Sequence, residues 1–262
     1  MVAPTPAQPR KPTPSPASLP PLSALDPIRF AGPVELGSTV RFGASVAAGL
    51  HARQLRVSEA FTLHDSRGIP FRASVKDLSD DRGAALIYEQ MQLPPESPLE
   101  LTLICAVLAR QRMTVVMQKA TEIGCNRIYP ALSEHSVPVG GLEHEKAHAW
   151  PNQVVRAVRQ CRRARVPETA PAAPLVEVLA RPAWSQADLR VFLDDTGESG
   201  VIPDTAGSCV LAVGPEGGWS AEERELLLER GAIPWRLSGR ILRAETAVLA
   251  GLVLLQARFG DF

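Results

Sequence analysis

The segment AVGPEGGWSAEE, residues 212–223, joins a buried apolar run to a helix through a glycine-rich turn. The run 208–214 reads as a strand. Ser220 with Glu223 three residues later predicts a capping box at the start of the helix that Gly231 ends. The turn lacks the Lys-Ser/Thr of a P-loop and does not fit G-x-G-x-x-G. The glycines therefore predict either close approach of a ligand to bare backbone or a tight surface turn.

A second irregular stretch, LSGRILRAETA at 237–247, also follows an expected strand and precedes a helix. Ligands of open α/β sheets bind beyond the carboxyl ends of the strands. If the two strands are neighbours, these two loops face each other across one crevice. Their backbone groups suit an adenine edge and a ribose, and no Asp-rich set accompanies them. The sequence thus argues against a metal site and against magnesium-dependent phosphoryl transfer.

Strands and helices alternate after a Pro-rich linker at 92–100, which predicts an α/β domain with a mostly parallel sheet. The expected strands are residues 99–109, 126–132, 189–195, 208–214 and 233–239. The expected helices are residues 110–124, 143–164, 220–231 and 243–259, with a break foreseen at Pro151.

The N-terminal part of the chain has a different character. Residues 30–92 read as short strands with one helix near 47–57, which predicts a small β-barrel. The Pro-rich start is expected to be a disordered tail. The predicted division is a tail at 1–27, a barrel domain at 28–95 and an α/β domain at 96–262.

Composition sets broad limits on function. The formal charge is zero, from 28 basic and 28 acidic residues, and nearly all the basic residues are Arg. Arg suits bidentate phosphate contacts, although the bias equally fits genome composition. The four cysteines are widely spaced and are expected to be buried thiols rather than disulfides or zinc ligands. Neither a secretory signal nor a membrane span is predicted, which favours a cytoplasmic protein.

Several motifs together resemble one family. GPEGGWSAEE, RILRAETA, QKATEIGCNRIYP and QARFGDF, with HARQLRV, SEHSV and RQCRRARVPE, run in the order of the 16S ribosomal RNA uridine-N3 methyltransferases (RsmE type) of the SPOUT superfamily. The resemblance spans residues 51–262. It implies a C-terminal trefoil-knot α/β domain, a PUA-like RNA-binding barrel before it, and a homodimer in which the partner helps complete each site.

The resemblance also implies that the two loops bind bent S-adenosylmethionine, with the end of the strand near Leu193 as a third wall. The implied cofactor-binding residues are Leu193, Gly214, Pro215, Glu216, Gly217, Gly218, Leu237, Ile241, Leu242, Thr246 and Ala247. The implied partner is 16S rRNA of the small ribosomal subunit, and the family target is N3 of uridine 1498.

Two residues are the candidates for catalysis. Uridine N3 is a poor nucleophile until it loses its proton, so the enzyme must take that proton or stabilise the resulting anion. The Arg243 fork could face a uracil carbonyl and N3, and Glu245 could act as base. Equally, Arg243 could only anchor the loop or a phosphate, and Glu245 could simply favour the positive end of a helix.

Three basic groups are candidates for RNA contact. The stretch 146–167 is rich in Arg and has no acid, and Arg156, Arg159 and Arg163 share a helix face. The alternative is that this helix face is simply exposed to solvent and binds nothing. The other two groups lie near the start of the α/β domain and on the helix of the barrel. They comprise Arg110, Arg112 and Lys119, and His51, Arg53 and Arg56.

The sequence departs from the family pattern at a few positions. His135 stands where Arg is usual, Arg159 where Glu is usual, and Ser238 and Gly239 where Gly-Pro is usual. His135 reads as a structural or surface residue. These departures leave open a methyltransferase with another rRNA or tRNA target. A non-catalytic RNA-binding ribosome-assembly protein is a further alternative, which the intact cofactor loops disfavour.

Overall fold

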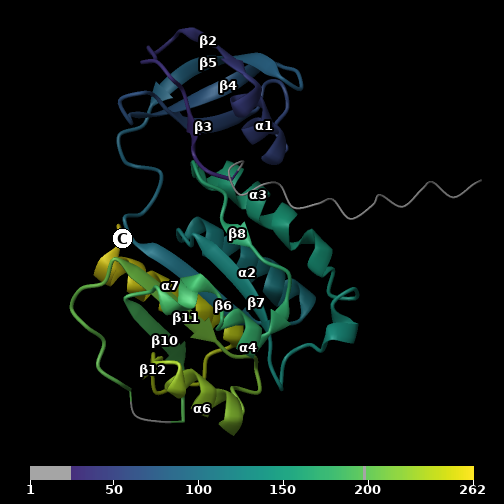
Figure 1. Ribbon diagram of the computed structural model, residues 1–262, viewed down its shortest axis with the longest axis vertical. Coiled ribbons are helices and arrows are strands. Elements are labelled where there is room, and N and C mark those ends of the chain that lie inside the picture. The colour runs from purple at the N-terminus through teal and green to yellow at the C-terminus, as the bar shows by residue number, and fades with distance from the viewer. Residues whose placement is uncertain (1–24, 197–198) are drawn as a thin grey trace, which may run out of the picture.

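The computed structural model describes residues 25–196 and 199–262 (Figure 1). Most of the expected tail, residues 1–24, lies outside the described residues. Leu25 is the first residue described, and it packs against the core of the C-terminal sheet. The chain therefore touches its C-terminal half before it enters the N-terminal sheet.

The N-terminal unit is a five-stranded sheet in the order β1-β3-β4-β5-β2. Its strands are β1 (Ile28–Arg29), β2 (Thr39–Gly43), β3 (Ala60–His64), β4 (Pro70–Leu78) and β5 (Arg82–Gln90). Alternate residues of β4 face a core with Leu50 of α1 (Ala44–Ala52), because side chains alternate along a strand. The helix was expected near 47–57. It ends earlier because Gln54 adopts a left-handed conformation, with φ of 53°.

The C-terminal unit confirms the predicted α/β architecture with a parallel sheet. Its strands are β6 (Glu100–Ala106), β7 (Arg127–Leu132), β8 (Glu168–Thr169), β9 (Ala173–Pro174), β10 (Leu189–Leu193), β11 (Ser208–Val213) and β12 (Ile233–Trp235). They pair in parallel in the order β12-β10-β11-β6-β7-β8, with β9 also against β7. The short strands β8 and β9 were not anticipated, since two residues carry no periodicity.

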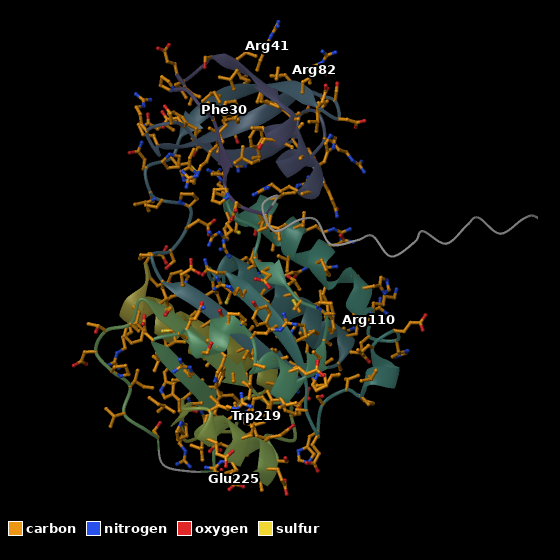
Figure 2. The ribbon with its side chains drawn as sticks, viewed as in Figure 1. Phe30, Arg41, Arg82, Arg110, Trp219 and Glu225 are labelled. Atoms are coloured by element: carbon orange, nitrogen blue, oxygen red, sulfur yellow. The ribbon has the colours of Figure 1, made fainter. Side chains whose placement is uncertain are left out.

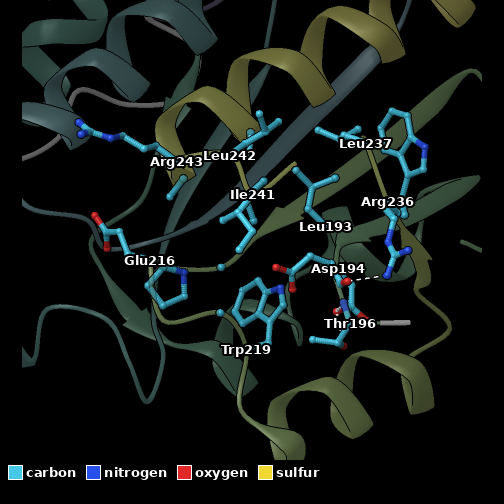
Figure 3. Close-up of a pocket in the computed structure, with 18 of the residues that line it drawn as sticks. Leu193, Asp194, Thr196, Glu216, Trp219, Arg236, Leu237, Ile241, Leu242 and Arg243 are labelled. Atoms are coloured by element: carbon cyan, nitrogen blue, oxygen red, sulfur yellow. Dashed lines mark hydrogen bonds between the residues drawn. The ribbon is translucent and has the colours of Figure 1, made fainter. Parts of the chain in front are cut away.

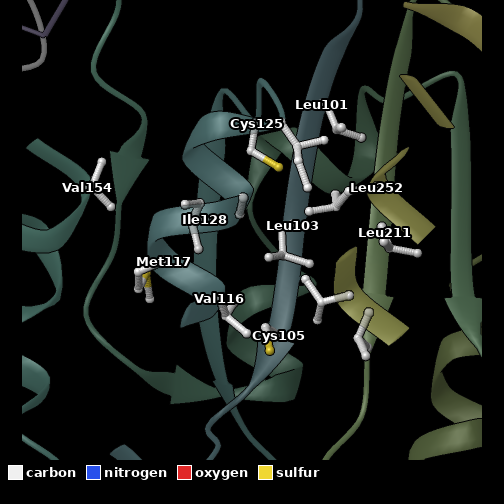
Figure 4. Close-up of a cluster of buried hydrophobic side chains, with 14 of the residues drawn as sticks. Leu101, Leu103, Cys105, Val116, Met117, Cys125, Ile128, Val154, Leu211 and Leu252 are labelled. Carbon is white, nitrogen blue, oxygen red and sulfur yellow. The ribbon is translucent and has the colours of Figure 1, made fainter. Parts of the chain in front are cut away.

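Helices cover both faces of this sheet. One face carries α2 (Arg110–Glu122), α3 (Trp150–Cys161) and α7 (Ala244–Phe259), and the other carries α4 (Leu175–Val178), α5 (Pro182–Ser185) and α6 (Ala221–Glu229). Leu103 and Cys105 point to the first face (Figure 4). Ile104, between them in the chain, belongs to the core of the second face. Burial on both faces explains why β6 reads as a continuous apolar run.

Local signals explain the helix ends. The predicted capping box of α6 is confirmed, since the Glu223 amide donates to Ser220 Oγ at 3.3 Å and the Ser220 amide to the Glu223 carboxylate at 3.0 Å. The helix expected over 143–164 is shorter. Pro151 starts α3 rather than breaking it, because a proline in the first turn needs no amide hydrogen bond. Residues before it form short 3₁₀ turns.

Candidate active site

A pocket of about 460 Å³ opens at the carboxyl ends of β10, β11 and β12 (Figure 3). The two loops singled out in the sequence both line it. They do not follow adjacent strands, because β10 lies between β11 and β12. The loop after β10 therefore forms the middle of the wall, and the pocket is built from three loops.

Most of the predicted cofactor residues meet in this pocket. The ones that line it are Leu193, Gly214, Pro215, Glu216, Gly217, Gly218, Leu237, Ile241, Leu242 and Ala247. Thr246 does not line it; it is exposed on the first turn of α7. Side chains that the sequence analysis did not assign to the pocket also contribute, namely Asp194, Asp195, Thr196, Trp219, Arg224, Trp235, Arg236, Ser238 and Arg240. The acidic pair after the strand 189–193 was the available signal for the first two.

The glycine-rich loop is held tightly from one side. Gly218 has a φ of 73°, and its amide donates to the Pro215 carbonyl at 3.0 Å to close a turn. A Cβ on Gly217 would lie 2.9 Å from His135 Cβ. His135 Nδ1 lies 3.2 Å from the Gly218 carbonyl, to which it donates. His135 thus supports this loop, in keeping with the structural role expected for it.

Trp219 lies against the start of the same loop. A Cβ on Gly214 would be 3.2 Å from the Trp219 indole, so the ring packs on bare backbone. The side chain also packs on the core beneath α6. Its buried Nε1 has no hydrogen-bond partner among the described residues. A buried donor left unpaired in this way is costly to the fold.

The loop after β10 is fixed by polar contacts. Arg224 Nε of α6 donates to Asp194 Oδ2 at 2.6 Å, and the Thr196 amide and hydroxyl donate to Asp194 Oδ1. Burial alone would raise the pKa of Asp194, but these hydrogen bonds outweigh it and hold the pKa below its ordinary value. Arg236 Nη2 donates to the Asp195 carbonyl at 2.6 Å and ties this loop to the one after β12.

The two catalytic candidates lie at the start of α7 but face different surroundings. Arg243 lines the pocket mouth, is exposed, and its guanidinium has no partner within the described part of the chain. Figure 3 shows its side chain directed away from Leu237, on the side of Glu216. Glu245 does not line the pocket. It faces α2, where its Oε2 lies 3.9 Å from Arg112 Nε.

Burial contradicts two of the predicted RNA contacts. Arg53 is 3 % exposed and donates to the carbonyls of Gly49, Asp26 and Ala164. Burial lowers its pKa to about 10. Arg163 is 6 % exposed and donates to Glu96 and to two carbonyls. Both guanidiniums bind groups within the fold, so neither is available to RNA phosphate.

The other predicted RNA contacts differ in whether their side chains already have a partner within the described residues. Arg159 pairs with Glu59 of the N-terminal unit, Arg112 with Glu216, and Lys119 with Glu122 at 2.7 Å. The exposed His51 lies 3.2 Å from the Ser79 carbonyl through Nε2. The side chains without a partner in the described ranges are those of Arg56, Arg110 and Arg156. Arg110 projects at the start of α2, at the outer edge of the C-terminal unit (Figure 2).

The described residues offer neither of two other kinds of feature, a metal-ligand cluster or a membrane-spanning helix. They contain no group of three or more His, Cys, Asp or Glu side chains that could hold a metal ion. No helix among them is long and apolar enough to cross a membrane.

Comparisons with known proteins agree with this geometry. The model of an RNA methyltransferase domain matches residues 95–256. The ribosomal RNA small subunit methyltransferase E of Synechocystis is 31% identical over 211 residues, covering 78% of this chain and 68% of that protein. That of Buchnera aphidicola is 27% identical over 211 residues, covering 79% and 85%.

A solved structure is similar over nearly the whole fold. It is the Neisseria gonorrhoeae ribosomal RNA small subunit methyltransferase E bound to S-adenosyl methionine, with a TM-score of 0.64 and 30% identity. The match covers 90% of this chain and 99% of that one. The chain thus carries an RNA methyltransferase domain and is an RNA methyltransferase enzyme. Within that class, the chain belongs to the ribosomal RNA small subunit methyltransferase E family.

Proposed function

We propose that the protein transfers the methyl group of S-adenosylmethionine to N3 of one uridine in 16S rRNA, the family target uridine 1498. The observation that carries this proposal is the pocket in which ten of the eleven residues proposed for the cofactor meet. Its walls fit an adenosine, because apolar side chains, glycine backbone and Trp219 line a space of about 460 Å³.

The cofactor, when bound, supplies an electrophilic methyl group on a sulfonium. The residues of the chain would hold the cofactor and stabilise the deprotonated uracil. Leu193, Leu237 and Leu242 would hold its apolar part beside the glycine-rich loop. Arg243, which lines the pocket and has no partner among the described residues, would face the uracil and stabilise the negative charge left when N3 loses its proton. Glu245 is retained as a candidate proton acceptor, although it would have to be approached from outside the pocket.

The remaining family features belong to the same proposal. We place the division between a PUA-like barrel at 28–95 and a knotted α/β domain at 96–262, and expect a cytoplasmic homodimer. The partner would cover the exposed apolar side chains of α7, among them Val253 and Leu254. RNA would meet Arg56, Arg110 and Arg156, the predicted RNA contacts whose side chains have no partner in the described ranges.

Nucleoside mass spectrometry of rRNA from a deletion strain tests the function. N3-methyluridine should disappear from 16S rRNA and return when the intact gene is supplied. Persistence of the nucleoside would contradict the proposal. Loss of a different methylated nucleoside would keep the enzyme class and change the target.

A further inference from the structure

Three charged side chains from separate segments meet beside the pocket. Arg112 belongs to α2, Glu216 to the glycine-rich loop and Glu245 to the first turn of α7. Arg112 Nη1 donates to Glu216 Oε1, and Arg112 Nε lies 3.9 Å from Glu245 Oε2. One guanidinium therefore uses two of its nitrogens toward two different elements of the site.

The two carboxylates differ in burial. The Glu216 side chain is 41 % exposed, whereas that of Glu245 is 18 % exposed. Glu245 Oε2 is buried and has no hydrogen-bond partner in the described residues. The only cation within ion-pair distance of it in this part of the structure is Arg112. A buried carboxylate oxygen without a donor is costly, so it needs this cation close by.

The position of Arg112 matters because the two main walls of the pocket are otherwise not linked by polar contacts. In the described ranges no hydrogen bond runs directly between residues 214–219 and 236–247. The spacing of the walls decides whether a ligand fits between them. Among the described residues, Arg112 is the polar group that reaches both the glycine-rich loop, at Glu216, and the first turn of α7 just outside the pocket, at Glu245.

We propose that Arg112 is a positioning residue that fixes the glycine-rich loop relative to the start of α7. It acts on methyl transfer through Glu216 and Glu245 and does not contact RNA phosphate. The inference rests on the proposed function for its effect on catalysis. The three side chains together carry a net charge of −1, which disfavours a phosphate at this point.

Replacing Arg112 tests the proposal. Arg112→Gln should weaken S-adenosylmethionine binding about tenfold and slow single-turnover methylation of 16S rRNA by at least as much. The salt dependence of RNA binding should stay unchanged. Arg112→Lys should restore little of the cofactor affinity, because a compact ammonium cannot contact two separate carboxylates as the planar guanidinium does.

The double variant Arg112→Gln/Glu216→Gln should bind cofactor no worse than Arg112→Gln alone. Arg230→Gln is the matched control, because Arg230 lies outside the pocket, is exposed, and its side chain has no partner among the described residues.

Amide hydrogen exchange gives a readout that does not depend on activity. In the free protein, the Gly218 and Ala247 amides should exchange faster in Arg112→Gln than in Arg230→Gln. Unchanged exchange and cofactor affinity would overturn the proposal, as would a salt slope for RNA reduced by about one. Failure of the wild type to bind cofactor or methylate RNA would instead contradict the proposed function.

Discussion

Arg163 Nη2 and Glu96 Oε2 lie 2.6 Å apart, in an ion pair between the end of α3 and the linker that joins the two sheets. The other Glu96 oxygen accepts from the amides of Ala164 and Arg165 at 2.9 and 2.8 Å. The Pro-rich linker predicted at 92–100 is thus held in place near its centre by Glu96. The Glu96 carboxylate accepts four hydrogen bonds in all, from Nε and Nη2 of Arg163 and from the amides of Ala164 and Arg165, and so stabilises the junction between the two units.

Removing this carboxylate should destabilise the protein. Glu96→Ala leaves the buried Arg163 unpaired, and we expect a loss of about 3 kcal/mol in the free energy of unfolding. Glu89→Ala is the matched control, since it breaks the exposed Arg162–Glu89 pair and should cost less than about 1 kcal/mol. Urea unfolding measures both. Equal losses would show that the Glu96 network contributes nothing special.

Arg243→Ala should separate chemistry from cofactor binding. The guanidinium lines the pocket without a partner in the described part of the chain, and removing a preorganised donor of this kind costs about 10²–10³-fold in turnover. The dissociation constant of S-adenosylmethionine, measured by calorimetry, should change little. If affinity falls as far as turnover, Arg243 holds the cofactor or the loop instead.

Gly217→Ala should disturb the glycine-rich loop. The new Cβ would lie 2.9 Å from His135 Cβ, and overpacking of this kind costs about 1–3 kcal/mol. We expect cofactor affinity to fall about tenfold. Gly239→Ala in the facing loop is the control, because nothing lies within 4 Å of its added Cβ. Comparable affinities for the two variants would mean that the loop adapts freely.

Salt titration of RNA binding can identify the cations that meet phosphate. Arg156 is exposed and without a partner in the described structure, so Arg156→Gln should weaken binding and reduce the salt slope by about one. Arg162 on the same stretch is paired with Glu89, and Arg162→Gln should leave the slope nearly unchanged. The reverse order would place RNA on another face.

Alkaline pH should unfold the protein through its buried thiols. Burial raises the pKa of Cys105, Cys125 and Cys209 to about 12, from an ordinary value of 9.0. Above pH 9 the unfolded chain loses protons that the folded chain keeps, so stability falls as pH rises. Each thiol contributes a slope of about 1.4 kcal/mol per pH unit in that window. Urea unfolding at pH 8 and 10 should show a flatter decline in Cys209→Ala, and an identical decline would contradict this reading.

Local signals in the sequence were sufficient for much of the fold. The apolar run at β6, the capping box at Ser220 and the glycine turn after β11 each depend on residues close in sequence. Elements without such a signal were missed, such as the two-residue strands β8 and β9 and the short helices α4 and α5. Pro151 was ambiguous, since proline both interrupts and begins helices.

The pocket at the carboxyl ends of β10, β11 and β12 was largely predictable for the same reason, because its walls are contiguous loops at strand ends. The pairing of the surface charges was not predictable from the sequence. The stretch 146–167 contains no acid, yet Arg159, Arg162, Arg163 and Arg165 pair with Glu59, Glu89, Glu96 and Glu100 from distant segments. Sequence alone fixes which side chains carry charge and which loops are glycine-rich. Only the tertiary structure decides which charges neutralise each other, because the Coulomb energy of a pair depends on distance and burial in space, not on separation along the chain.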